Sequence, residues 1–535
     1  MRRRGEAGFP RGEGAIAVLV ATALALRLAT LTWGIGLGPF SGWYHPDEDK
    51  AWSSVVGFPD NYLSNRRFIY GTALQYTVGT LLFPFRRLWE SGHPLFPSIT
   101  YVQFAVLADR SVHALLGAAT VGLTYQMALR LWDRATAVLA AAVLTVCFYH
   151  AMGSALTTLD VPMGFLVTLG VLVTAHAADA PRVGRFVALG ALLGFLAGTK
   201  ITGAAFGIVP IAMAISAPRS ERPRWIVGGG VAVVVAAVVF GLTTPHVILH
   251  PRAYLRFMED QRAVWIGAAR HSPLAIAWAW LRAMAIALMP PVALLALIGI
   301  AVGRVTPAAR RLEIALLAYL ASQVLIWRGY LPPRFLLPMT PIFCGYAARA
   351  LVLATTSPHA GLRRAGPVLT ALVLVSSLAT VLGGIWTRWR DVRTEAAYAI
   401  AHALPSGATL GFATTRADRR SDHSWRFPTV DTTRYRLSDV GDRPSFLIAS
   451  DWTLVPVRRA LESGRLGPGY VWPDSLSAVW YRRRVPSPEE FRFFEQLLAG
   501  RSGYRVVAHW KPATPLPVEF SDRGLWLYRR EDAAR

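Results

Sequence analysis

Residues 225–243 read WIVGGGVAVVVAAVVFGLT and contain no charged side chain. About 20 apolar residues span the hydrocarbon core of a bilayer, so this stretch predicts a transmembrane helix. About eleven apolar stretches long enough to cross occur along the chain, and hydrophobic residues make up 53% of its 535 positions. This composition is too apolar for an ordinary soluble protein. The sequence therefore predicts a polytopic α-helical membrane protein.

The predicted helices occupy the first 386 residues. They cover approximately residues 15–35, 101–129, 135–150, 161–178, 186–216 (two helices with a break near Thr199-Lys200), 225–243, 275–302, 312–327, 335–354 and 367–386.

Basic residues determine the expected topology. The formal net charge is +24 and only three lysines occur, so arginine dominates. The arginines gather in short loops between apolar stretches, which is the pattern that orients membrane helices rather than one that binds nucleic acid. Arg2, Arg3, Arg4 and Arg11 place the N-terminus in the cytoplasm before an uncleaved first helix. The bias toward Arg and Ala is typical of a GC-rich bacterial genome, so we expect a bacterial plasma membrane.

Two regions are predicted to lie outside the membrane, on its extracytoplasmic side. The first is a loop at about 36–100, in which the amphipathic residues 71–89 lie along the membrane surface. The alternative is that residues 71–89 cross the membrane, but the basic clusters would then not all face the cytoplasm. The second is a small α/β domain, residues 387–535, with strands at 409–413, 445–449, 504–509 and 525–528. A helix follows the N-cap signal Ser487-Pro488-Glu489-Glu490 and ends at Gly500.

An acidic motif, Trp43-Tyr44-His45-Pro46-Asp47-Glu48-Asp49-Lys50, follows the first apolar stretch. Charges at a membrane edge are costly, so they indicate a function. One interpretation is a helix N-cap with acids in the first turn, which Pro46 fits. The other is a general base that removes a proton from a hydroxyl group. The two roles are compatible.

Cations occur at the same predicted membrane edge as these carboxylates. Lys200 and Arg334 are candidates for binding a phosphate, although either side chain could instead extend to the interface. Asp160 could cap its helix, and Asp109 with Arg110 could be a local ion pair. His45, His246, His250 and His271 could form a metal site, but their spacing supports one weakly. The residues that could bind substrate are His45, Asp109, Arg110, Asp160, His246, Arg262 and Arg270. Cys147 and Cys344 lie in apolar stretches and are predicted to be buried.

An ordered set of motifs resembles the GT-C superfamily of membrane glycosyltransferases. The likeness is greatest to the family 39 branch, which includes protein O-mannosyltransferases and the aminoarabinose transferases of lipid A. It covers about residues 15–386, and the tail after Trp386 lacks it. The motifs are Trp43-Tyr44-His45-Pro46-Asp47-Glu48, Ala108-Asp109-Arg110-Ser111, Thr157-Thr158-Leu159-Asp160, Gly194-Phe-Leu-Ala-Gly-Thr-Lys200, Thr244-Pro245-His246 and Pro333-Arg334-Phe335-Leu336-Leu337-Pro338.

The resemblance implies a GT-C catalytic domain at residues 1–386 and a polyprenyl-phosphate sugar as donor. It implies inversion at the anomeric carbon, with Asp47 as general base and Glu48 as its partner. Lys200 and Arg334 would bind the donor phosphate, and no metal or other cofactor would be needed. The acceptor would be a lipid, glycan or protein hydroxyl.

Two other functions remain open at this point. A transporter or flippase of an anionic lipid-linked substrate would place charges near the bilayer midplane in an inverted repeat, but the charges here cluster at one edge. A non-catalytic scaffold that displays the external domain would tolerate the loss of Asp47, Lys200 and Arg334 together.

Overall fold

The computed structural model describes residues 11–35, 44–45, 47–65, 68, 71–265, 272–328, 331–413, 428, 434–438, 440–451, 454–455, 458, 462, 488–512 and 524–534. The chain forms two compact units. The first comprises Met1–Leu31, Lys50–Leu95 and Phe104–Leu382, and the second comprises Thr32–Asp49, Phe96–Gln103 and Gly383–Arg535.

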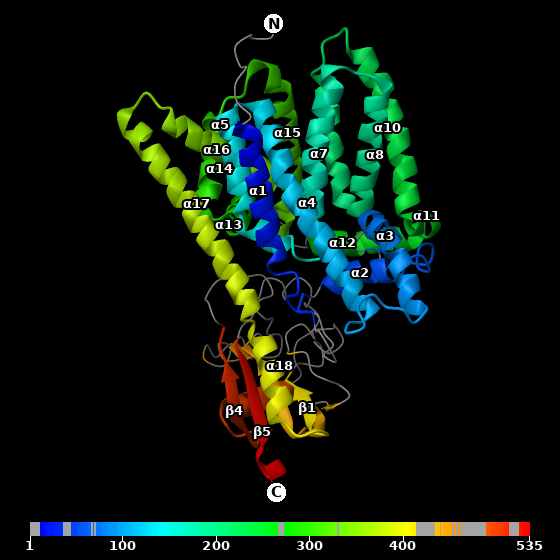
Figure 1. The fold of residues 1–535 in the computed structure, drawn as a ribbon, viewed down its shortest axis with the longest axis vertical. Coiled ribbons are helices and arrows are strands. Elements are labelled where there is room, and N and C mark those ends of the chain that lie inside the picture. Colours follow the sequence, from blue (N-terminus) through cyan, green and yellow to red (C-terminus); the bar gives the residue numbers. More distant parts are fainter. Residues whose placement is uncertain are drawn as a thin grey trace. The chain divides into compact units, whose positions relative to one another are not determined.

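The first unit is a bundle of helices, most of them roughly side by side (Figure 1). The helices, including those that continue into the second unit, are α1 (Arg11–Leu28), α2 (Glu48–Val56), α3 (Ala73–Glu90), α4 (Tyr101–Leu131), α5 (Arg134–Thr145), α6 (Phe148–Gly153), α7 (Asp160–Asp179), α8 (Val183–Thr199), η1 (Ile201–Gly207), α9 (Ile208–Ile215), α10 (Arg222–Thr243), α11 (Pro245–Leu249), α12 (Pro251–Trp265), α13 (Pro273–Leu288), α14 (Pro290–Val302), η2 (Pro307–Ala309), α15 (Arg310–Ile326), η3 (Pro333–Met339), α16 (Thr340–Thr355) and α17 (Ala360–Trp389).

Small residues allow the closest helix contacts in this bundle. Helix α8 packs along α10, and glycines at four-residue intervals face that partner. A Cβ atom on Gly190 would lie 2.4 Å from the carbonyl oxygen of Ala232, and one on Gly194 would lie 2.4 Å from that of Ala236. Small residues at such spacing let helix backbones approach closely within membranes. The two helices are therefore held in one register.

A buried arginine fastens α1 to the bundle. Arg27 is fully buried and donates to the carbonyl oxygens of Ala23, Leu144 and Thr145. Its guanidinium also lies 2.9 Å from Nδ1 of His150. A buried charge is costly unless hydrogen bonds satisfy it, so these contacts explain how a predicted membrane helix tolerates an arginine.

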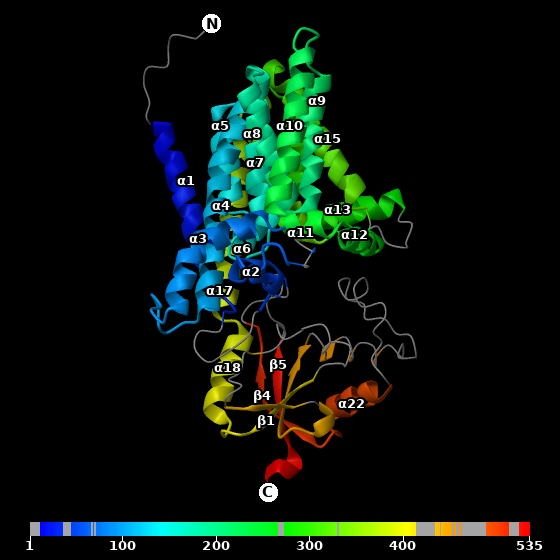
Figure 2. The ribbon, with the colours of Figure 1, turned by 90° about the vertical axis from the view of Figure 1, so that its right-hand side faces the viewer.

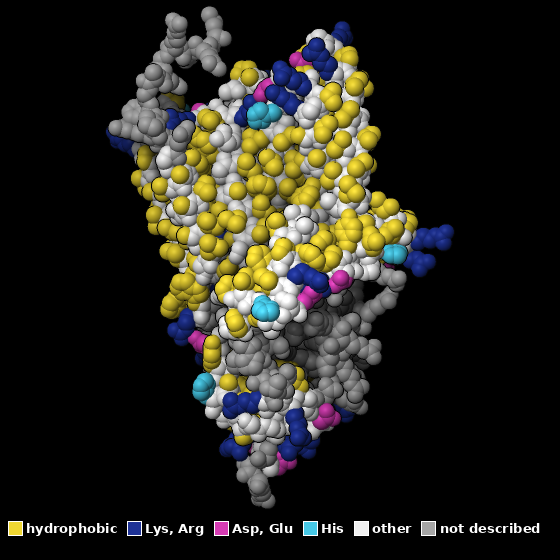
Figure 3. Space-filling view, turned by 45° about the vertical axis from the view of Figure 1, so that its right-hand side comes forward, with side chains coloured by type: hydrophobic (Ala, Val, Ile, Leu, Met, Phe, Trp, Pro, Cys, Tyr) yellow, Lys and Arg dark blue, Asp and Glu magenta, His cyan; other side chains and the backbone are white. Residues whose placement is uncertain are grey.

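Fewer described helices are long and apolar enough to cross a bilayer than the eleven spans predicted from the sequence. All eleven predicted stretches are largely helical, but only five described segments are long and apolar enough to cross a bilayer: Tyr101–Leu131, Asp160–Asp179, Arg222–Thr243, Pro333–Thr355 and Ala360–Ala403. The bent pair α13 and α14 would make a sixth. Shorter apolar helices account for most of the other stretches. Hydrophobic side chains cover the visible flank of the bundle, with charged groups gathered at its ends (Figure 3).

The single helix predicted at residues 275–302 was wrong. The chain bends by 118° between Pro273–Leu288 and Pro290–Val302. Met289 lies at the bend with φ of 71°, and two prolines follow it. Proline has no backbone N–H and disfavours a helical conformation in the residue before it, so α13 ends there and α14 begins anew.

Residues 71–89 were predicted to lie at the surface rather than cross. Helix α3 is not among the five spans, and it lies toward the same end of the bundle as α11 and α12 (Figure 2). Its first half is mostly buried, with Leu74, Tyr76 and Val78 in the interior, whereas its second half is mostly exposed. The start of α3 makes its contacts with α8 and α10. The arrangement supports the surface interpretation.

The second unit contains a mixed sheet covered by helices. Its elements are α18 (Val392–Ala403), β1 (Thr409–Phe412), β2 (Arg436–Ser438), η5 (Val440–Asp442), β3 (Phe446–Ser450), α22 (Pro488–Leu498), β4 (Tyr504–Trp510), β5 (Leu525–Arg530) and η6 (Glu531–Ala534). The strand order is β2-β1-β3-β5-β4. Strands β2, β1 and β3 are parallel to one another, and β5 is antiparallel to both β3 and β4.

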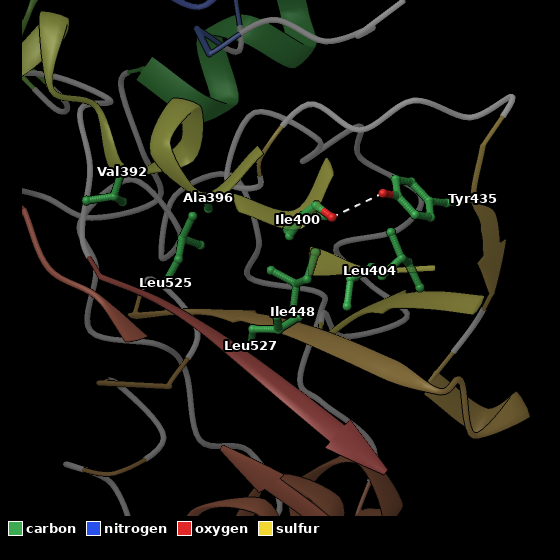
Figure 4. Packing of buried hydrophobic residues seen from close by; sticks show 9 residues of the cluster. Val392, Ala396, Ile400, Leu404, Tyr435, Ile448, Leu525 and Leu527 are labelled. Atoms are coloured by element: carbon green, nitrogen blue, oxygen red, sulfur yellow. Dashed lines mark hydrogen bonds between the residues drawn. The ribbon is translucent and has the colours of Figure 1, made fainter. Parts of the chain in front are cut away.

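Helix α18 belongs to the core of this sheet. Val392, Ala396 and Ile400 pack with Ile448 and Leu527, as Figure 4 shows. The hydroxyl of Tyr435 donates to the carbonyl oxygen of Ile400 at 3.1 Å, which ties the loop before β2 to the helix.

The predicted α/β character of this region is confirmed. The four predicted strands correspond to β1, β3, β4 and β5, and the predicted helix is α22, which is followed by Gly500 at φ of 68°. The sequence pattern did not indicate β2 or α18. Strand β2 has only three residues, and α18 follows α17 almost without a break.

Candidate active site

A buried ion pair joins two predicted site residues. Nζ of Lys200 lies 2.6 Å from Oδ1 of Asp160. Their side chains are 13% and 2% exposed, respectively. Asp160 is the first residue of α7 and Leu159 precedes it as N-cap, so the prediction that Asp160 caps the helix was wrong. Lys200 ends α8 and pairs with Asp160, which favours the phosphate-binding interpretation over the alternative that its side chain extends to the interface.

The break at Lys200 is built into the backbone. Helix α8 stops at Thr199, and Lys200 adopts an extended conformation with φ of −152° and ψ of 127°. The chain continues as the 3-10 helix η1. The predicted break near Thr199-Lys200 is therefore confirmed, and it turns the lysine away from the helix surface toward Asp160.

Arg334 approaches the same lysine through a shared aromatic ring. Nζ of Lys200 lies 4.3 Å from the centre of the Phe335 ring, and Cζ of Arg334 lies 5.6 Å from it. Segment η3, which carries both residues, packs against the start of α7. Two cations and one carboxylate thus gather at one end of the bundle, and arginine and lysine are the side chains that commonly bind phosphates.

The start of α3 and the junction of α10 with α11 meet the end of α8. Thr72 donates through Oγ1 to the carbonyl oxygen of Thr243 at 2.7 Å. A Cβ atom on Gly71 would lie 1.9 Å from the carbonyl oxygen of Gly198. The Gly194–Lys200 and Thr244-Pro245-His246 motifs, far apart in sequence, therefore lie at one place in the fold.

Gly71→Ala is expected to lower the free energy of unfolding by about 1–3 kcal/mol, because the methyl group of the alanine would overlap backbone atoms that cannot move aside. The measurement is thermal unfolding of the purified protein in detergent. The control is Gly229→Ala in α10, where no atom lies within 4 Å of the added Cβ. Equal melting temperatures for the two variants would contradict the predicted contact.

His246 is buried where these segments meet. It lies in α11, its ring stacks on that of Phe68 with centroids 5.7 Å apart, and Phe68 also contacts Tyr254 and Phe257. Burial lowers the pKa of His246 to about 4, and the nearby His250 acts in the same direction. The imidazole is therefore neutral near pH 7.

His246→Leu is expected to reduce the loss of stability in acid. An unfolded histidine has a pKa of about 6.5. Between that value and about 4 the unfolded chain binds more protons than the native chain, so native stability falls as the pH falls. One such group lowers the free energy of unfolding by at most about 1.4 kcal/mol for each pH unit. Melting temperatures at pH 7 and pH 5 test this effect, with the exposed His93→Leu as control. The expectation fails if His246→Leu and wild type lose the same stability.

The acidic motif begins a short helix. Helix α2 starts at Glu48, so Asp47 takes the preceding position, which is where a capping residue lies. The backbone N–H of Asp47 donates to Nδ1 of His45 at 3.2 Å, which requires the imidazole proton to be on Nε2. The side chains of His45, Asp47 and Glu48 are mostly or fully buried, with Asp47 the most exposed at 9%. The side chains of Asp49 and Lys50 lie outside the described residues.

The same motif is anchored by residues that the sequence did not single out. The guanidinium of Arg393 lies 3.9 Å from the centre of the Tyr44 ring and donates to the Tyr44 carbonyl oxygen at 3.3 Å. Arg393 also pairs with Asp391 at 2.7 Å. The indole N–H of Trp33 donates to Asp391 at 2.8 Å. The sequence shows that Asp391 and Arg393 lie just beyond the last apolar stretch, but it does not show that they are buried.

The remaining predicted site residues make other contacts. Asp109 faces His113, one turn further along α4, at 3.5 Å. Arg110 donates to the carbonyl oxygen of Leu31 at 2.6 Å. Arg262 lies in α12, but its side chain is outside the described residues, as is Arg270 altogether.

Metal ligands do not gather in the part of the chain that the structure describes. Within it, no three His, Cys, Asp or Glu side chains are arranged to hold a metal ion. His271, one of the four candidate histidines, lies outside that part. Cys147 and Cys344 are both buried and free, as predicted.

Comparisons with known proteins place this fold among characterised membrane proteins. Residues 98–249 match the family described as dolichyl-phosphate-mannose-protein mannosyltransferase. No curated protein matches the chain. ArnT from Cupriavidus metallidurans, solved with undecaprenyl phosphate, is 15% identical with a TM-score of 0.50, over 86% of this chain and 96% of that chain. AglB from Archaeoglobus fulgidus, solved with an inhibitory peptide and a dolichol-phosphate, is 11% identical with a TM-score of 0.50, over 97% of this chain and 88% of that chain.

These likenesses confirm the predicted fold class and the resemblance to GT-C membrane glycosyltransferases. At identities of 11% and 15%, the structural matches establish the shared fold. The family match contains four of the six motifs found in the sequence, those that include Asp109, Asp160, Lys200 and His246. The acidic motif and the segment with Arg334 lie outside it.

Proposed function

We propose that this chain, which has the GT-C fold and matches the mannosyltransferase family over residues 98–249, is an inverting glycosyltransferase. It moves a sugar from a polyprenyl-phosphate donor to a hydroxyl group of a lipid, glycan or protein. The reaction takes place on the extracytoplasmic face of a bacterial plasma membrane, with the N-terminus in the cytoplasm. Residues 1–386 carry out catalysis, and residues 387–535 contribute to acceptor recognition.

The observation that carries the proposal is the group of charges at one end of the bundle. Lys200 is held by Asp160 and lies over Phe335, next to Arg334. An ammonium has three N–H donors, so one ion pair leaves donors for a phosphate oxygen. A polyprenyl chain would stay in the bilayer while its phosphate met these cations. The fold relative ArnT was solved with undecaprenyl phosphate, a lipid of this chemistry.

Asp47 is the proposed general base. The acceptor oxygen attacks the anomeric carbon from the face opposite the phosphate, the bond between carbon and phosphate oxygen breaks, and Asp47 takes the acceptor proton. The departing phosphate is already a stable anion and needs no general acid, so one carboxylate is enough. Lys200 and Arg334 stabilise the charge that develops on it. Glu48 is fully buried beside Asp47 and is proposed to hold the local geometry.

Two experiments test the proposal. The purified protein is supplied with polyprenyl-phosphate sugars, and the release of polyprenyl phosphate is followed for each. In parallel, cells that lack the gene are compared with wild type by mass spectrometry of their envelope glycans, lipids and glycoproteins. The expected result is the loss of one sugar from one component. Substrate movement that needs an ion gradient but no acceptor would instead establish a transporter.

A further inference from the structure

Asp391, the N-cap of α18, holds Arg393, and Arg393 contacts the acidic motif. Oδ1 of Asp391 accepts from the backbone N–H and from Nε of Arg393, at 3.0 and 2.9 Å. Oδ2 accepts from the guanidinium of Arg393 at 2.7 Å and from the indole of Trp33 at 2.8 Å. A carboxylate has about four acceptor positions, so Asp391 uses its full capacity on these partners.

Arg393 carries the contact from this carboxylate to the motif. Its side chain is 2% exposed, and it lies between Asp391 and the ring and carbonyl oxygen of Tyr44. The Tyr44 hydroxyl is hydrogen-bonded to that of Thr394 at 3.2 Å. A planar guanidinium can pair with a carboxylate in a fork and stack on an aromatic ring at the same time, which lysine cannot do. Both ends of Tyr44 are thus fixed to α18.

Only two residues separate Tyr44 from Asp47, and a hydrogen bond links the first of them, His45, directly to Asp47. His45, which follows Tyr44, accepts from the backbone N–H of Asp47. Its carbonyl oxygen accepts from the backbone N–H of Glu48 at 3.3 Å. The contact therefore runs from Arg393 through Tyr44 and His45 to the residue that begins α2.

We propose that Arg393, held by Asp391, is a positioning residue that sets the orientation of Asp47. Because α18 also packs in the core of the C-terminal sheet, the sheet supports the loop that carries Asp47. This inference rests on the proposed function, since it assigns Arg393 a role through the general base. Arg393 is not among the residues proposed to contact the donor or the acceptor.

The test compares Arg393→Gln with Arg390→Gln. Arg390 lies just before α18, is 54% exposed and pairs with Glu395 at the surface, so it is a matched control. Arg393→Gln is expected to lower kcat about 10²-fold, the size of effect that a misplaced catalytic group produces. KM for the polyprenyl-phosphate sugar is expected to be unchanged, because the residues proposed to bind the phosphate are elsewhere. Arg390→Gln is expected to behave as wild type. An unchanged kcat in Arg393→Gln overturns the inference.

Hydrogen exchange supplies a measurement that does not depend on activity. In Arg393→Gln, backbone amides of residues 44–56 are expected to exchange faster than in wild type, while those of β3 and β5 keep their protection. Faster exchange in β3 and β5 as well would show that the substitution unfolds the C-terminal domain, which would overturn a positioning role. Unchanged exchange at residues 44–56 would also overturn it.

The failure of this inference differs from the failure of the proposed function. If Asp47→Asn is inactive while Arg393→Gln is fully active, the general base stands and its positioning by Arg393 is wrong. If Asp47→Asn is fully active, the proposed base is wrong whatever Arg393 does. Arg393→Lys gives a further check, because it keeps the charge without the fork and is expected to restore only part of kcat.

Discussion

Asp47→Asn is expected to lower kcat by about 10²–10⁴-fold, the usual contribution of a general base, and to reduce transfer to background. The amide has nearly the same shape as the carboxylate but cannot accept the proton of the attacking hydroxyl. The 9% exposed side chain at the start of α2 can still accept a hydrogen bond as a cap, so folding is expected to be intact.

The measurement is single-turnover sugar transfer with saturating donor, alongside thermal unfolding. Asp60→Asn is the control, because Asp60 is 71% exposed and pairs with Arg86. It is expected to retain wild-type turnover. Wild-type turnover in Asp47→Asn would remove Asp47 from the mechanism and leave only its position at the helix start.

Lys200→Met is expected to have the second-largest effect, on both stability and activity. Removing one partner of a buried ion pair leaves the other charge uncompensated and costs about 3–5 kcal/mol. Asp160 is 2% exposed, so it would be such an uncompensated charge. The same substitution would remove a proposed phosphate ligand, and donor KM is expected to rise.

A double variant separates the two consequences. Lys200→Met with Asp160→Asn replaces the pair by neutral groups, and such replacements are often neutral or even stabilising. Thermal stability is therefore expected to return toward wild type, while donor KM stays high. Lys511→Met, at an exposed position in the C-terminal region, is the control. Recovery of donor binding in the double variant would show that Lys200 has only a structural role.

The membrane architecture could be predicted because it depends on local composition. Long apolar stretches give helices, arginines give loops, and the break before Lys200 follows from an interrupted apolar pattern. The bend at Met289 was missed because an apolar stretch looks continuous whether or not the helix axis turns. Several predicted apolar stretches contain turns or 3-10 segments, which composition does not distinguish from α-helix. For this reason fewer helices than predicted are long enough to span a bilayer.

The candidate site was only partly predictable. Lys200 and Asp160 could be named from their residue types, but their pairing depends on how α7 and α8 meet. Arg110 was grouped with Asp109 because they are adjacent, whereas adjacent helical residues point in different directions. Arg393 was missed because α18 was not predicted, and a surface arginine and a buried one have the same sequence signal.

The glycines of α8 have one more consequence, which concerns mechanical rigidity. They hold α8 and α10 so closely that neither helix can slide past the other without a clash. Lys200 follows α8 and His246 follows α10, so the contact between the two helices also sets the positions of these two residues relative to each other. Gly190 is about 15 Å from Lys200 along the helix axis, at 1.5 Å per residue. A larger side chain there would push α8 and α10 apart and shift Lys200 relative to His246, so residues remote from the charged group help to determine the geometry of the proposed phosphate site.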